Sequence, residues 1–116
     1  MIRFAGYAAV FDRPDRGGDV VRAGAFGKVG PVPLLWQHRG APVGVIERIE
    51  EDAKGLRVIG RADPDLVRIG AGLSFGYRAK AARRGAWREL SAVDLVEISL
   101  VASPMQPLAR VHAVET

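Results

Sequence analysis

Apolar and polar side chains alternate with a period of two along most of this chain, which predicts a mainly β fold. Each alternating run is short and stops at a cluster of Gly, Pro or Asp, as strands do at turns. About seven strands are expected, and residues 19–22 could form a further short one. The expected strands cover residues 2–11, 32–38, 43–49, 56–62, 73–80, 87–101 and 109–114.

Helical signals are weak by comparison. Residues 63–70 could form one short helix, because Asp63 suits an N-cap and Pro64 the first helical position. A second helix at residues 23–30 is a poorer prediction, since that segment is short and rich in glycine. The expected architecture is a compact closed or partly open barrel with one or two short helices, built as a single domain over residues 1–116.

The composition narrows the chemistry. The chain of 116 residues contains no cysteine, which excludes disulfides, a thiolate nucleophile and cysteine-ligated metal. Its two histidines have no acidic partner at short spacing, so neither a metal nor a cofactor is expected. The N-terminus lacks a signal-peptide core and no apolar run approaches about 20 residues, so we expect a soluble, cytoplasmic protein.

The formal charge of +4 permits an acidic partner or nucleic acid. A nucleic-acid-binding strand face would carry aromatic side chains interleaved with arginines. Only Tyr77 beside Arg78 and Trp87 beside Arg88 fit that pattern, so nucleic acid is not the favoured partner.

Three apolar, strand-like blocks each contain one side chain capable of catalysis. His38 ends the first, Ser74 lies between Gly72 and Gly76 in the second, and Glu97 lies between two apolar residues in the third. An imidazole base, a hydroxyl nucleophile and a carboxylate that orients the base are the parts of a serine hydrolase. The glycines around the serine are not spaced as in the Gly-x-Ser-x-Gly elbow of α/β-hydrolases.

Each of these residues also has a purely structural interpretation. His38 could be a core histidine with one backbone partner, Ser74 a small residue on a crowded strand face, and Glu97 the partner of an arginine. An ionised carboxylate flanked by apolar residues needs some partner, and an imidazole would provide one.

The order of these blocks resembles the prohead proteases of tailed phages, which are capsid-maturation serine proteases related in fold to the herpesvirus assemblins. The resemblance extends from about Phe4 to Val111. In this family's pattern His38 matches the histidine and Ser74 the serine, while Glu97 matches a recurrent acidic position where assemblins have a second histidine. The matching segments are residues 4–11, 17–21, 24–26, 33–38, 42–44, 54–56, 73–77, 93–101, Pro104 and 109–111.

The resemblance implies an assemblin-like fold and a serine protease that acts inside the immature capsid. Its expected substrate is the scaffold segment of the major capsid protein, and self-cleavage and a homodimer are also implied. Residues 103–106 would provide the backbone donors for the oxyanion. Residues 63–71 depart from the family, whose members have a longer helical stretch there. Two alternatives stay open: an inert capsid-assembly module on the same fold, and a small basic barrel that binds nucleic acid.

Overall fold

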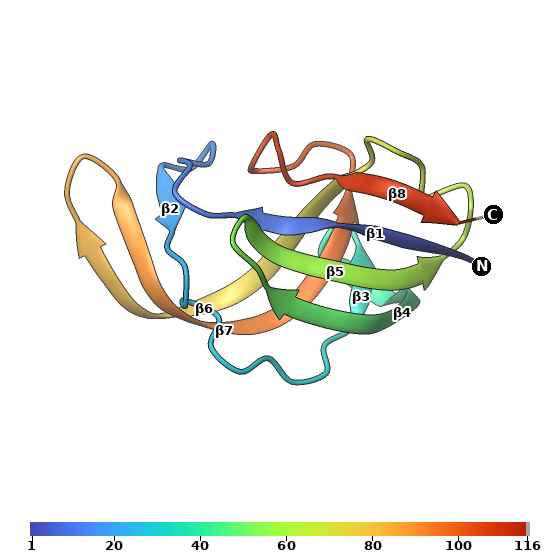
Figure 1. Cartoon of the computed structure of the whole chain (residues 1–116), viewed down its shortest axis with the longest axis horizontal. Coiled ribbons are helices and arrows are strands. Elements are labelled where there is room, and N and C mark those ends of the chain that lie inside the picture. The colour runs from blue at the N-terminus through green and yellow to red at the C-terminus, as the bar shows by residue number, and fades with distance from the viewer. Residues whose placement is uncertain (116) are drawn as a thin grey trace.

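The structure is a computed structural model that describes residues 1–115, and strands account for most of them (Figure 1). No helix occurs in this part of the chain. The strands are β1 (Ile2–Val10), β2 (Asp19–Val21), β3 (Leu34–Trp36), β4 (Arg39–Glu51), β5 (Gly55–Ala62), β6 (Gly72–Arg84), β7 (Arg88–Val101) and β8 (Val111–Glu115).

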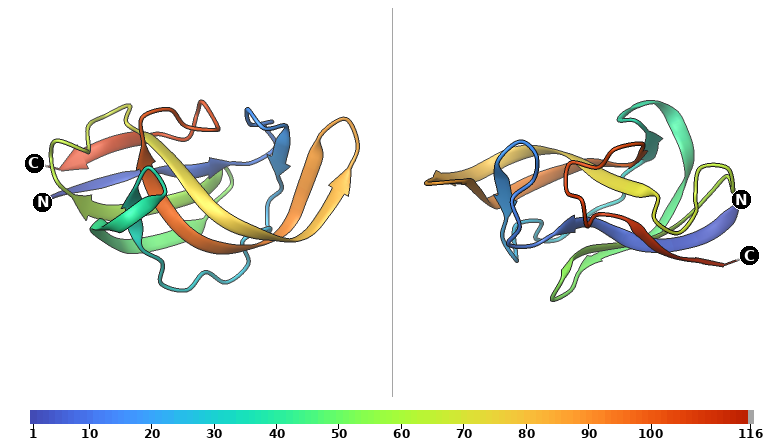
Figure 2. Two further views of the ribbon diagram at one scale, coloured as in Figure 1. Left: turned by 180° about the vertical axis from the view of Figure 1, so that it is seen from behind. Right: turned by 90° about the horizontal axis from the view of Figure 1, so that it is seen from above.

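One strongly curved sheet contains all eight strands. Its order is β2-β7-β3-β4-β5-β1-β8, and β6 pairs with β7. β7 is parallel to β2 and β3 and antiparallel to β6. The sheet curls until β6 crosses β1, as Figure 2 shows. A bridge between Gly72 and Arg110 and the bond from the Leu73 N–H to the Ala109 carbonyl span the remaining gap. The result is a partly open barrel.

The core lies inside this curl. Alternation directs one side of each strand inward, and the inner positions carry mostly aliphatic and aromatic side chains. Removing such side chains from water is the main favourable contribution to folding. The largest fully buried residues include Phe4, Leu34, Leu56, Leu73, Leu90, Ile98 and Leu100.

The strand predictions are confirmed to within a few residues at most ends, but the prediction of helices is wrong. Residues 63–71 form two tight turns, closed by bonds from the Leu66 N–H to the Asp63 carbonyl and from the Ala71 N–H to the Arg68 carbonyl. The Asp63 carboxylate accepts the Asp65 N–H, as an N-cap would, but no helix follows. Nucleating a helix is costly, and this segment is too short to recover that cost. Residues 23–30 likewise contain turns only.

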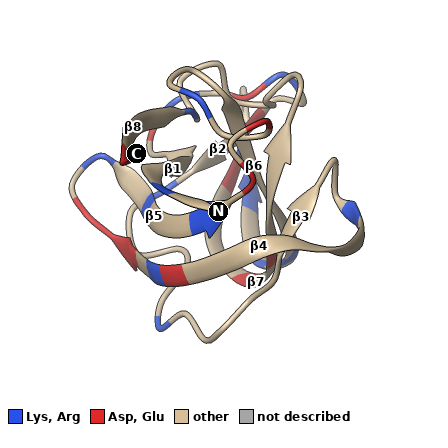
Figure 3. Cartoon of the chain, turned by 90° about the vertical axis from the view of Figure 1, so that its right-hand side faces the viewer, with Lys and Arg blue, Asp and Glu red and all other residues tan. Residues whose placement is uncertain are grey.

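The hairpin of β6 and β7 extends beyond the barrel, away from both termini (Figure 1). The distal half of β6 is fully exposed. Positive and negative side chains are intermixed over the body, as β4 illustrates (Figure 3). Over residues 1–115 the structure contains no helix that is long and apolar enough to cross a membrane.

Candidate functional site

His38 lies in a tight turn rather than at the end of a strand. Trp36 pairs with Arg39, so Gln37 and His38 alone connect β3 to β4. Their φ angles are 56° and 63°, which is the left-handed conformation that a two-residue type I′ hairpin requires. Residues other than Gly, Asn, Asp and His seldom adopt this conformation, so Gln37 is the less usual of the two, and residues held in it cluster at functional sites.

The turn is held against β7 and the residue that follows it by three hydrogen bonds. The Gln37 N–H donates to the Leu100 carbonyl and the His38 N–H to Ser99 Oγ, each over 3.0 Å. The Ala102 N–H donates to Gln37 Oε1 over 2.7 Å. These bonds offset the backbone strain and fix the imidazole relative to β7.

The imidazole of His38 contacts the carboxylate of Glu97 through Nδ1 and Oε1. An ionised carboxylate can only accept hydrogen bonds, so the Nδ1–H donates and Nε2 is left to act as a base. The Glu97 side chain is 9% exposed and that of His38 42% exposed. His38 is therefore reachable from solvent rather than packed in the core, and the partner of Glu97 is a histidine rather than an arginine.

The second carboxylate oxygen of Glu97 accepts a hydrogen bond from Ser99 Oγ over 2.6 Å. Across the β6–β7 ladder, Glu97 is the register partner of Gly76. A Cβ at Gly76 would lie 2.5 Å from Glu97 Oε1, so only glycine leaves room for the carboxylate in this position.

Ser74 is the register partner of Ser99, two residues from Gly76 along β6. Directly paired residues point to the same face of a sheet, so Ser74 lies on the face that carries Ser99 and Glu97. No hydrogen bond joins Ser74 to His38 within residues 1–115. Ser74 is 6% exposed. Among residues 1–115, every side-chain nitrogen or oxygen atom that is fully buried has a hydrogen-bond partner, and the Ser74 hydroxyl has none. The hydroxyl therefore reaches solvent.

A cavity of about 90 Å³ adjoins Ser74, and Met105 and Gln106 form part of its wall. Gln106 is held in place by two bonds to the backbone of Val10. Asp19 and Tyr77 line another side of the cavity. A serine on a strand beside a small cavity can present its hydroxyl as a nucleophile to a carbonyl group bound in that cavity.

Asp19 joins this wall to β7 through Arg88. The Arg88 guanidinium donates to both carboxylate oxygens of Asp19, and the Tyr77 hydroxyl donates to one of them, each over 2.8 Å. The bonds from Arg88, with a smaller contribution from Tyr77, hold the pKa of the Asp19 carboxyl below its usual range despite burial. Burial and the bond to Asp19 raise the pKa of Tyr77 to about 12. The tyrosine is thus engaged in a polar network with Asp19 and Arg88.

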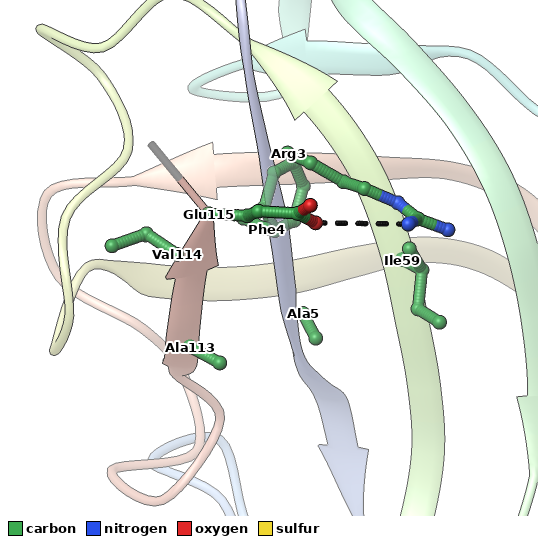
Figure 4. Close-up of a pocket in the computed structure, with 7 residues that line it drawn as sticks. All are labelled: Arg3, Phe4, Ala5, Ile59, Ala113, Val114 and Glu115. Atoms are coloured by element: carbon green, nitrogen blue, oxygen red, sulfur yellow. Dashed lines mark ion pairs between the residues drawn. The ribbon is translucent and has the colours of Figure 1, made fainter.

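A second cavity, of about 210 Å³, lies between β1, β5 and β8 (Figure 4). Its wall contains one ion pair, between Arg3 and Glu115 over 3.7 Å, and otherwise apolar side chains. None of His38, Ser74 and Glu97 lines it. Among residues 1–115 no group of three His, Asp or Glu side chains could hold a metal ion.

The structure thus brings His38 and Glu97 into contact and places Ser74 on the same sheet face. Ser99 was not singled out from the sequence, although it follows Glu97 by two residues and so lies on the same face. The contact between Ser99 and the backbone of His38 has no sequence signal, because it depends on the conformation of the turn.

Comparison with known structures defines the class of fold. The chain is similar to KSHV protease, solved in complex with a hexapeptide phosphonate inhibitor, with a TM-score of 0.66. The similarity covers 99% of this chain and 65% of that one, at 12% sequence identity. The protein therefore has the assemblin fold, which confirms the predicted fold class.

Sequence comparison defines the family. The model of the family described as caudovirus prohead serine protease matches residues 1–116, and the chain belongs to this family. It is also 37% identical over 68 residues to the prohead protease of Enterobacteria phage HK97. That match covers 53% of this chain and 30% of the HK97 protein, so it spans less than a third of that relative's length.

Proposed function

We propose that this chain is a serine endopeptidase domain that cleaves the scaffold segment of a major capsid protein, and also itself, during procapsid maturation. The observation that carries the proposal is the His38–Glu97 contact, on the sheet face that also bears Ser74. Membership of the prohead serine protease family supports the same conclusion.

In the proposed mechanism, Ser74 Oγ attacks the carbonyl carbon of the scissile peptide bond while His38 Nε2 removes its proton. Glu97 holds the Nδ1–H tautomer and stabilises the imidazolium that forms. The tetrahedral intermediate then collapses, the C–N bond breaks, and His38 gives its proton to the leaving amine. Water, activated by the same imidazole, hydrolyses the acyl-enzyme and regenerates the Ser74 hydroxyl.

The backbone N–H groups of Met105 and Gln106 are the proposed donors to the oxyanion. Both residues line the cavity beside Ser74, and within residues 1–115 neither N–H donates to another protein atom. Both residues belong to segment 103–106, in which the donors are expected. Loss of one such donor typically lowers the rate on the order of 10²–10³-fold.

The proposed setting is the interior of the procapsid in a bacterial host, where the concentrations of enzyme and substrate are both high. A homodimer is part of the proposal, since the resemblance to the family implies one. No cofactor or metal is needed, because the three side chains and the backbone donors supply the chemistry of acyl transfer.

Coexpression with the cognate major capsid protein tests the function. The intact mass of the capsid protein should fall to that of a processed form with the wild-type chain and stay at full length with Ser74→Ala. Ser91→Ala is the matched control, because Ser91 is an exposed serine on the same strand as Glu97 whose hydroxyl donates to the Ala81 carbonyl and to no catalytic candidate. Unprocessed capsid protein with a folded wild-type chain would favour the inert assembly module, and processing by Ser74→Ala would exclude this serine as the nucleophile.

A further inference from the structure

We infer that Ser99 is a positioning residue, whose single hydroxyl sets both the rotamer of Glu97 and the turn that carries His38; this role rests on the proposed function. Ser99 lies on β7, is 0% exposed, and has no contact with the cavity beside Ser74. It would therefore act on catalysis only through the other two residues.

The hydrogen-bonding capacity of the hydroxyl matches its two neighbours. Ser99 Oγ donates its one proton to Glu97 Oε2 over 2.6 Å and accepts the His38 N–H over 3.0 Å. A serine hydroxyl has one donor and two acceptor sites, so both bonds form at once. With Oε2 engaged by Ser99, the carboxylate presents Oε1 to the imidazole.

The alternative rotamers of Glu97 are restricted from the other side as well. Gly76 lies directly opposite on β6, and its Cα approaches so closely that even a methyl group would collide with Oε1. The carboxylate is thus held between the backbone of β6, the hydroxyl of Ser99 and the ring of His38. Of these three constraints, only the Ser99 hydroxyl also binds the backbone of His38.

Because one hydroxyl bonds both residues, Glu97 and His38 are positioned relative to the same atom. The Ser99 hydroxyl ties the carboxylate and the histidine turn to one point on β7, which fixes their mutual geometry. Removal of the hydroxyl leaves the buried Glu97 Oε2 and the His38 N–H without these partners. The two groups would then be joined only by their direct contact.

Ring-nitrogen NMR of His38 tests the role without any cleavage reaction. In the Ser74→Ala protein we expect the His38 ring to be a single Nδ1–H tautomer. Adding Ser99→Ala should give a mixture of the two tautomers, whereas adding Ser91→Ala should change nothing. An unaltered tautomer in a folded Ser99→Ala protein would overturn the inference.

Kinetics with the intact nucleophile provide the second readout. We expect Ser99→Ala to lower kcat by up to about 10²-fold with KM little changed, as a misplacement of about 1 Å can do. Ser99→Ala combined with Glu97→Gln should lose less than the product of the two single losses, because part of the effect of Ser99 acts through Glu97. Additive losses in this cycle would assign Ser99 a general structural role and contradict the inference.

Two precautions keep the tests decisive. If Ser99→Ala does not fold, Ser99→Cys replaces it, because a thiol preserves the size of the side chain and is only a weak donor. Failure of the proposed function gives a different pattern: Ser74→Ala would then leave capsid processing unchanged, while the effect of Ser99 on the His38 tautomer would still be measurable.

Discussion

The glycine opposite Glu97 allows the sharpest prediction, which is that Gly76→Ala inactivates the protease without unfolding it. A Cβ at this position would lie 2.5 Å from Glu97 Oε1, whereas ordinary contact begins at 3.4 Å. The carboxylate must therefore withdraw by 3.4 − 2.5 = 0.9 Å, and the bond to His38 is the contact it would lose. A misplacement of this size lowers a rate by roughly 10²-fold.

The same substitution should leave the stability nearly unchanged. The nearest atoms to the new methyl group belong to a side chain rather than to the backbone. Replacing a glycine within a strand also removes an entropic cost of about 0.5–1 kcal/mol, which opposes the strain. Gly85→Ala is the matched control, because a Cβ at Gly85 would meet no atom closer than 4.0 Å.

The assay is the initial rate of scaffold cleavage by purified protein, together with a thermal melt of each variant. We expect Gly76→Ala to lose about 10²-fold in kcat/KM while its Tm stays within a few degrees of wild type. Wild-type kcat/KM in Gly76→Ala would refute the reasoning, since it would mean that the position of the Glu97 carboxylate does not affect the reaction.

Three further predictions concern stability. Asp19→Asn should lower the free energy of unfolding by about 2 kcal/mol at pH 7, because it weakens the charged bonds from Arg88. Folding lowers the pKa of Asp19, so the stabilisation by its carboxylate is present above the unfolded pKa of about 3.9 and disappears as the pH falls through the folded value. Denaturant melts at several pH values should show the free energies of unfolding of the variant and the wild type converging in acid. A difference in free energy that does not change with pH would contradict this. Tyr77 has its pKa raised to about 12 from 10.0, so wild-type stability should fall as the pH rises through this range, and Tyr77→Phe should flatten that fall. Leu34→Ala should lower the free energy of unfolding, measured in urea, by about 3 kcal/mol, because Leu34 is 0% exposed and lies in register with Ile98. A loss below about 1 kcal/mol would show that the surrounding side chains close the cavity that the substitution leaves.

The strands were predictable because their signal is local. Alternation of apolar and polar side chains depends only on neighbouring residues, and it located β1, β5, β6 and β7 closely. The prediction of a helix at residues 63–70 is wrong, since an N-cap and a proline at the first helical position also begin isolated turns. The tertiary context, not the local sequence, decides between the two.

The site was predictable in its residue types but not in its geometry. His38, Ser74 and Glu97 were identified as the reactive side chains of three apolar blocks, and their roles stay predictions. The contact between His38 and Glu97 depends on the register of β3 against β7, which no single strand encodes. The positive φ angles of Gln37 and His38 were not foreseeable, because type I′ turns usually contain Asn or Gly.

β7 adjoins three other strands, and this has a consequence for when the enzyme can work. The strand that bears Glu97 also anchors β3, which leads into the histidine turn, and β6, which carries the serine. Because side-chain direction reverses at every residue, a slip of β7 by a single position would turn Glu97 and Ser99 away from both partners at once. A copy whose central strand has not yet docked would thus lack the proposed catalytic geometry altogether, so activity would begin only when this strand is in register.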